Sequence, residues 1–164
     1  MITELFETCN KPGIVSDDKS CWKDLGILDS PLAVCARNSE GRDWIVIQQR
    51  GQFGNGEQYF AKTISEYQEG FTSHGELWLG LDNLAQLTGS DSWELWVELT
   101  PWGTGLVQPK KLSAFYSSFE VGKGPSYQLT VAGFDSTRST LGDALKYHNG
   151  RKFSTRDKDQ DSDS

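Results

Sequence analysis

The chain has 164 residues with 23 acidic and 16 basic side chains, and its formal net charge is -7. This length suits one compact domain with a core of its own. The acidic balance argues against a general nucleic-acid binder, because affinity for the phosphate backbone comes from clustered Lys and Arg side chains. No stretch reaches the roughly 18 apolar residues of a membrane-spanning helix, so we expect no membrane insertion.

Residues 1–43 are polar and rich in turn signals, and they hold all three cysteines, Cys9, Cys21 and Cys35. Their spacing lacks the close Cys or His pairs of a zinc site. Composition leaves two readings open: one disulfide with an odd thiol, or three free thiols in a reducing compartment. Because no signal peptide is recognisable, we expect an intracellular protein or one whose leader is missing. We predict a small amino-terminal cysteine-containing lobe over residues 1–43.

From residue 44 onward, β-branched and aromatic runs alternate with short helical segments. We expect strands at residues 44–49, 76–81, 93–99, 114–121 and 127–133. We expect short helices at residues 63–69, ended by Gly70, at 82–87, and at 141–146 with Thr140 as the N-cap. Residues 101–109 are rich in breakers and predict a loop. The pattern predicts an α+β domain whose central lobe, residues 44–156, is an antiparallel sheet.

The clearest strand, residues 93–99, alternates between apolar and polar side chains. Trp93 and Leu95 point one way, and Glu94 and Trp96 point the other, which is the period of a half-buried strand. Trp96 is therefore a large ring on the more polar face. Two readings stay open: another layer covers Trp96, or it is an exposed aromatic that binds a partner.

The last eight residues, 157–164, carry four aspartates and one lysine. An acidic, solvated tail is one reading. A Ca²⁺ loop is the other, because carboxylates at every second position can converge on one hard cation. An EF-hand is excluded, since the run has no Gly at the sixth position and no room for a Glu at the twelfth.

No catalytic motif is present. The chain has two histidines, His74 and His148, and neither has a nucleophile pattern nearby. A Gly-x-Ser-x-Gly turn, a phosphate-binding loop and a His-Glu-x-x-His motif are all missing from the sequence. We therefore expect a protein that is not an enzyme.

Eight segments, in order, resemble fibrinogen C-terminal-like domains and cover most of residues 35–161. They are WIVIQQR (44–50), EYQEGF (66–71), GELWLG (75–80), LAQLT (84–88), WELWVEL (93–99), YQLTV (127–131), GDAL (142–145) and YHNGRKFSTRD (147–157). The ordered set makes the resemblance specific. It implies a small disulfide lobe, a twisted antiparallel sheet with short helices, and a third lobe that carries calcium and the ligand pocket.

The resemblance, with ficolins and tachylectin-like lectins as the comparison, implies a secreted, non-enzymatic lectin-like domain. The parent protein is expected to bind acetylated carbohydrates on microbial surfaces with calcium support, in innate defence or as a venom component, and to form a homo-oligomer at full length. The alternatives are a fibrinogen-like protein-interaction module, using Trp96 and residues 101–109, or a non-functional fragment. The chain ends at Ser164, so we expect a truncation before the pocket lobe and assign no ligand-binding residue.

The same resemblance implies the site residues. The calcium carboxylates are expected at Asp159 and Asp161, with the main-chain carbonyl of Asp163 beside them, so that residues 157–164 begin a calcium-binding loop. It also implies a disulfide between Cys9 and Cys35, although the local sequence around Cys21 leaves that residue open as the partner.

Overall fold

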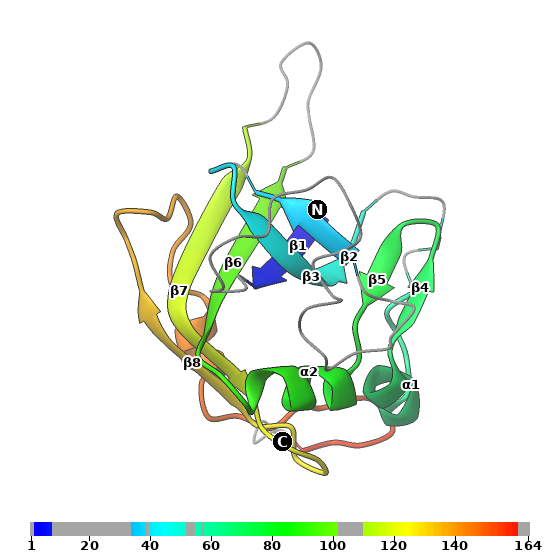
Figure 1. The fold of residues 1–164 in the computed structure, drawn as a ribbon. Coiled ribbons are helices and arrows are strands. Elements are labelled where there is room, and N and C mark those ends of the chain that lie inside the picture. The colour runs from blue at the N-terminus through cyan, green and yellow to red at the C-terminus, as the bar shows by residue number, and fades with distance from the viewer. Residues whose placement is uncertain are drawn as a thin grey trace.

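The fold is built around one antiparallel sheet. The computed structural model describes residues 2–7, 34–38, 40–51, 55–56, 58–101 and 110–160 (Figure 1). The strands are β1 (Ile2–Glu7), β2 (Val34–Arg37), β3 (Asp43–Gln49), β4 (Phe71–Ser73), β5 (Glu76–Trp78), β6 (Trp93–Thr100), β7 (Leu112–Val121) and β8 (Leu129–Phe134). They lie in the order β4-β5-β3-β1-β6-β7-β8, and β2 pairs with β3 outside this path.

In the described part of the chain, three short helices accompany the sheet. They are α1 (Ile64–Glu69), α2 (Leu81–Thr88) and the 3₁₀ helix η2 (Leu145–His148). Figure 1 shows α1 and α2 next to each other at one end of the molecule, and the two helices are in contact. The expected α+β class, with a dominant antiparallel sheet and a few short helices, is confirmed.

β1 lies in the middle of the sheet, between β3 and β6. In its register, Phe6 is opposite Val46 of β3 on one side and Trp96 of β6 on the other. β2 also joins β3, with Val34 opposite Val46. The described backbone of residues 1–43 thus shares a sheet with the strands that follow. The lobe boundaries at residues 43 and 156 stay predictions.

The helix expected at residues 63–69 is confirmed as α1, and its ends follow from local chemistry. The Thr63 side chain accepts a hydrogen bond from the backbone N–H of Glu66, and the Glu66 carboxylate accepts one from the backbone N–H of Thr63. This capping box satisfies N–H groups that the first turn leaves open. The helix ends at Gly70, whose φ of 89° lies in the region that favours glycine.

The helix expected at residues 141–146 is wrong. The helical turn is η2, which begins only at Leu145. Thr140 does not cap a helix, because its hydroxyl accepts the backbone N–H of Ser113 in β7 at 2.8 Å. The backbone N–H groups of Thr140 and Leu141 also donate to the Ser113 carbonyl, at 2.8 and 2.9 Å. A neighbouring strand therefore takes the groups that a helix start at Thr140 would have used.

One face of the sheet is covered by α2, and we call its buried side chains the helix-side cluster. Three leucines of α2, Leu81, Leu84 and Leu87, pack into it. Burying apolar side chains of this size contributes about 1.5–3 kcal/mol each, so the cluster is a main source of stability. Its other buried members are Ile45, Ile47, Leu79, Ala85, Trp93, Leu95, Ala114, Tyr116, Phe119, Val121, Tyr127 and Val131.

The opposite face carries a smaller group that we call the Trp44 cluster: Trp44, Val46, Leu77, Trp96 and Phe115. The Trp44 and Trp96 rings are 5.9 Å apart and tilted by 45°. Trp96 is only 2% exposed, so the reading in which another layer covers it is confirmed. The alternative, an exposed aromatic that binds a partner, is wrong, because the neighbouring aromatic side chains bury the ring.

Gly80 sets how closely the two α-helices approach. Its φ is 106°, and a Cβ at this position would lie 2.9 Å from the carbonyl oxygens of Gln68 and Glu69 at the end of α1. Only glycine fits this backbone geometry without strain. Among the described helices, none has the length and apolar character to cross a membrane.

Candidate functional site

The acidic segment at residues 157–164 is the predicted calcium loop, and the structure describes it as far as Gln160. Asp159 is exposed and follows a tight turn in which Thr155 and Lys158 form an isolated antiparallel bridge. The other two predicted ligands, Asp161 and Asp163, lie outside the described residues. The structure therefore places one of the three predicted ligands.

Hydrogen bonds within the turn fix its backbone. The N–H of Thr155 donates to the Lys158 carbonyl at 3.0 Å, and the N–H of Lys158 donates back to the Thr155 carbonyl at 3.1 Å. The Gln160 N–H donates to Ser154 Oγ at 3.0 Å, and its side-chain amide donates to the Phe153 carbonyl at 2.9 Å. The backbone from Ser154 to Gln160, which precedes Asp161, is therefore held by several hydrogen bonds.

Asp157 connects this turn to α1. Its carboxylate accepts the backbone N–H of Ile64 at 3.0 and 3.3 Å and the hydroxyl of Thr155 at 2.9 Å. The first N–H groups of a helix lack partners within the helix, so a carboxylate there satisfies one of them and opposes the positive end of the helix dipole. Asp157 and Asp159 are both exposed, but the Asp157 carboxylate is bound to the start of α1.

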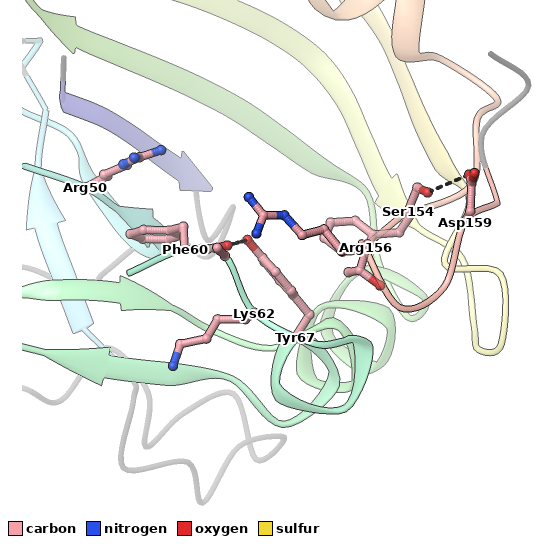
Figure 2. Close-up of a pocket in the computed structure, with 10 residues that line it drawn as sticks. Arg50, Phe60, Lys62, Tyr67, Ser154, Arg156 and Asp159 are labelled. Carbon is pink, nitrogen blue, oxygen red and sulfur yellow. Dashed lines mark hydrogen bonds between the residues drawn. The ribbon is translucent and has the colours of Figure 1, made fainter. Parts of the chain in front are cut away.

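The Asp159 carboxylate accepts a hydrogen bond from Ser154 Oγ at 3.4 Å (Figure 2). Exposed carboxylate oxygens in a turn are ligands that Ca²⁺ prefers. Among the described residues, no three His, Cys, Asp or Glu side chains gather closely enough to hold a metal ion. That finding does not reach Asp161 or Asp163, so the calcium site stays a prediction.

A pocket of about 560 Å³ opens beside the turn. Figure 2 shows that its walls come from the end of β3, the start of α1 and the turn at residues 154–160, which we call the acidic turn. Asp159 lines one side of it. The other lining residues are Arg50, Phe60, Ala61, Lys62, Tyr67, Phe153, Ser154, Thr155 and Arg156.

Tyr67 forms part of the pocket wall, and its hydroxyl donates to the Phe60 carbonyl at 2.8 Å. Burial raises the pKa of the Tyr67 phenol, and the positive charge of Arg50 lowers it in part. The phenol therefore stays neutral at physiological pH. Its ring also packs against Phe153, with the ring centroids 5.0 Å apart.

Sequence reasoning missed the basic residues of this pocket. Arg50, Lys62 and Arg156 are far apart in the chain, and nothing in their local sequence marks them as neighbours. The tertiary structure places all three around one pocket, and the bond of Asp157 to the start of α1 helps to hold the turn there. A sequence signal was present only for Arg156, which lies next to the acidic run.

Several predicted residues lie elsewhere. Cys9 and Cys21 fall outside the described residues and Cys35 lies in β2, so the Cys9–Cys35 disulfide stays a prediction. His74 is exposed in a turn, where its Nδ1 lies 2.8 Å from Ser73 Oγ. His148 is exposed at the end of η2.

Comparison with known families gives one clear match. Residues 25–164 match the family described as the C-terminal globular domain of fibrinogen beta and gamma chains. The match covers far more than half of the chain and includes the acidic turn and the basic pocket. It indicates no enzyme family.

Curated relatives match more than three quarters of the chain. Tenascin of Mus musculus is 41% identical over 130 residues, which is 78% of this chain and 6% of the relative. Ficolin-3 of Homo sapiens is 38% identical over 78% of this chain and 40% of the relative. Angiopoietin-related protein 1 of Mus musculus is 34% identical over 77% of this chain and 24% of the relative. The chain thus spans less than half the length of these relatives.

A solved structure agrees with these matches. The fibrinogen-like globe domain of human ANGPTL6 superposes with a TM-score of 0.69 at 35% sequence identity. The superposition covers 79% of this chain and 55% of that chain. The structural match is thus to a fibrinogen-like domain, in agreement with the family match.

Proposed function

Since this chain belongs to the family of the C-terminal globular domain of fibrinogen beta and gamma chains, we propose that it is a secreted, non-enzymatic recognition domain with a calcium-supported loop. The observation that carries the proposal is the turn at residues 154–160. Asp157 is held by α1, and the exposed Asp159 follows it on a backbone fixed by hydrogen bonds.

The cation in this proposal is Ca²⁺, bound by the carboxylates of Asp159 and Asp161 and the carbonyl of Asp163. Alternate positions along an extended chain bring oxygen atoms to one side, which suits a cation that takes six to eight oxygen ligands. Bound Ca²⁺ would offset the mutual repulsion of the aspartates and order the loop. The described turn supplies a rigid start for such a loop.

Calcium binding is tested by thermal unfolding. A ligand that binds only the folded state raises the midpoint, so 10 mM Ca²⁺ on a site of millimolar affinity should raise Tm by about 3–5 °C. Asp159→Asn should lose most of this shift. Asp91→Asn, which changes an exposed aspartate in the turn before β6, is the matched control and should keep it. No shift in the parent chain, or equal shifts in both variants, would overturn the calcium proposal.

For the ligand, we favour acetylated carbohydrate, bound by the full-length protein on microbial surfaces. The support is the similarity to Ficolin-3, which is 38% identical over 78% of this chain. The natural full-length protein should be retained on immobilised N-acetylglucosamine in the presence of Ca²⁺ and released by EDTA. Absence of retention, with an intact calcium shift, would overturn the carbohydrate assignment and leave the calcium proposal standing.

A protein-interaction role is the second candidate. Tenascin and Angiopoietin-related protein 1 match as much of this chain as Ficolin-3 does. Trp96 does not serve such a role, because it is buried. Failure to bind any acetylated sugar, together with saturable binding to a purified receptor ectodomain, would favour this candidate.

We also propose that Cys9 and Cys35 form a disulfide, in keeping with an extracellular location. Peptide mapping of the non-reduced protein should yield the Cys9–Cys35 linked peptides and a free thiol at Cys21. Linkage of Cys21 to Cys35 would overturn this pairing.

A further inference from the structure

Another pocket, of about 440 Å³, opens over the face of the sheet that carries the helix-side cluster. Val97 and Leu99 of β6 and Ala114 of β7 line it from the sheet, and Val97 lies opposite Ala114 in the register. As far as the structure describes the lining, no residue of α2 belongs to it. The pocket therefore lies beyond the part of the face that α2 covers, and Val97 and Leu99 are only half-buried there.

The segment after β8 forms the other wall of this pocket. Leu141 and Leu145 line it and pack against the helix-side cluster. The backbone N–H of Leu141 donates to the carbonyl of Ser113, the residue before Ala114 in β7, at 2.9 Å. Hydrogen bonds thus hold the two walls together. A preformed, mostly apolar pocket of this volume is typical of a small-molecule site.

Asp143 is the one charged residue in the described lining. Its Oδ1 accepts the hydroxyl of Tyr116 at 3.1 Å and the backbone N–H of Lys146 at 3.1 Å. Tyr116 is itself only 2% exposed and also lines the pocket, so the carboxylate is held in place from the core. Among the described residues, no group forms a hydrogen bond with Oδ2, which leaves this oxygen available to a ligand.

The Asp143 carboxylate determines which head group suits the pocket. A carboxylate accepts hydrogen bonds, so it matches a donor and repels an anion. An ammonium group supplies both N–H donors and the opposite charge. The net charge of -7 adds a long-range attraction for cations. Because the described lining contains no basic side chain, it has no charge that would repel an ammonium group.

We propose that this pocket binds an amphiphilic amine, with its alkyl chain against Val97, Leu99 and Leu145 and its ammonium group on the Asp143 carboxylate. A free amine with one long chain fits better than a lysine of a partner protein, because about 440 Å³ is more room than the short stem of a lysine fills. The inference goes beyond the proposed function and does not rest on it, since none of the proposed calcium ligands lines the pocket.

The head group is tested with three probes that share an eight-carbon tail: n-octylamine, which is protonated at pH 7, n-octanol and octanoate. Each is titrated into the natural protein by calorimetry at pH 7. We expect n-octylamine to bind about fivefold more tightly than n-octanol, which is the gain from an exposed ion pair. Octanoate should bind more weakly than n-octanol. Absence of n-octylamine binding, or equal affinities for the three probes, would overturn the proposal.

Asp143→Asn removes the charge but keeps an Oδ1 acceptor for Tyr116 and Lys146. It should reduce the preference for n-octylamine over n-octanol to within about twofold. Asp82→Asn is the matched control, because Asp82 is also exposed, also accepts a tyrosine hydroxyl, that of Tyr127, and does not line the pocket. It should keep the preference. Equal losses in the two variants would mean diffuse attraction to an acidic chain and would overturn the site.

The tail is tested by its length. Each buried methylene group strengthens binding about fourfold, so n-octylamine should bind at least about tenfold more tightly than n-butylamine, which has the chain length of a lysine. Ala114→Leu, which fills the pocket from the sheet, should weaken n-octylamine binding about tenfold, with Tm as the check that the variant is folded. Equal affinities for the two amines would assign the site to a lysine of a partner protein and overturn the free amine.

EDTA separates this inference from the calcium proposal. Binding of n-octylamine should persist in EDTA, whereas the Ca²⁺-induced rise in Tm should not, so either result can fail alone. Loss of n-octylamine binding in EDTA would overturn the inference, because none of the residues that carry it is a proposed calcium ligand.

Discussion

Both faces of the sheet carry buried side chains, but the hydrogen bonding of their buried polar atoms differs. On the helix-side cluster, Trp93 Nε1 donates to the Leu87 carbonyl at 3.0 Å. Thr88 Oγ1 accepts the Val121 N–H at 2.9 Å and donates to the Leu84 carbonyl at 2.8 Å. On the Trp44 side, three buried atoms, Trp44 Nε1, Trp96 Nε1 and Glu98 Oε2, have no partner among the described residues.

The difference follows from what covers each face. The last carbonyls of a helix have no partner within the helix, so the end of α2 offers acceptors to side chains on β6. Among the described residues, two cations lie over rings of the Trp44 cluster: Arg138 lies 3.6 Å from the centre of the Phe115 ring, and Arg42 lies 5.4 Å from that of Trp44. The described polar contacts of Trp93 and Thr88 are thus neutral hydrogen bonds, whereas those over the Trp44 cluster include charged side chains.

The largest expected effect tests the charged face. Glu98 is 2% exposed, and one of its oxygens is bound by Lys111, whose side chain is half exposed. Lys111→Met would leave a buried carboxylate without its main partner. We expect a loss of about 2–3 kcal/mol in the free energy of unfolding, measured by urea denaturation at pH 7.

The double variant Lys111→Met with Glu98→Leu is the control for that experiment. Because it removes both charges together, we expect it to recover most of the stability. A single-variant loss below about 0.5 kcal/mol, as for an ordinary surface ion pair, would show that charge does not distinguish the two faces.

A matched pair on β6 sharpens the comparison. Trp93→Phe and Trp96→Phe remove the same atoms from opposite faces of one strand, so their packing losses should be similar. Trp93→Phe also leaves the Leu87 carbonyl without its donor, whereas the Trp96 indole N–H has no partner among the described residues. We therefore expect Trp93→Phe to be about 2 kcal/mol less stable than Trp96→Phe in urea denaturation. Equal losses would contradict the hydrogen-bond argument.

Arg138 provides a smaller test of the cationic cover. Its guanidinium lies over Phe115 and pairs with Glu40 at 2.6 Å. Arg138→Gln should cost about 1 kcal/mol in the same assay. The loss should shrink in 1 M NaCl, since salt screens the ion pair in the parent chain. A loss that does not depend on salt would assign the effect to packing.

The smallest expected effect lies in α1, beside α2. Thr63→Ala removes the cap and should cost about 0.5–1 kcal/mol. The capping-box hydrogen bonds from Thr63, with Lys62 nearby, lower the pKa of Glu66 to about 2. A carboxylate whose pKa is lower in the folded than in the unfolded chain stabilises the fold at pH values above its unfolded pKa. The contribution of Glu66 should therefore be lost as the pH falls from about 4.5 to about 2. Urea denaturation of Glu66→Gln across that range should show a weaker pH dependence than the parent chain.

Much of the fold was predictable from side-chain periodicity, because periodicity is local. The alternation at residues 93–99 correctly gave β6 and its buried face, and Thr63 with Glu66 correctly marked the start of α1. Thr140 looked like an equally good cap, but Ser113, which is distant in sequence, takes its hydroxyl. Local rules fail where a long-range partner competes for the same group.

The candidate site divides in the same way. The acidic run that contains Asp159 is contiguous, so the sequence alone left a Ca²⁺ loop open beside an acidic tail, and the family resemblance favoured the loop. The basic pocket is not contiguous: Arg50 and Arg156 line the same pocket because long-range contacts, such as that of the Asp157 carboxylate with the start of α1, place the two segments beside each other. No pattern in either segment encodes that contact, and it therefore required the structure.

The central place of β1 has a consequence for how the chain folds. Glu7 pairs with Ile45 on one side and with Leu95 on the other. The β6–β7–β8 meander can form from neighbouring segments, but the middle of the sheet can close only after β6 has been synthesised. Such long loop closures slow folding, and until β6 pairs with β1, the edge of β1 that β6 will cover stays open to other chains. We expect nascent chains that stop before β6 to be prone to aggregation.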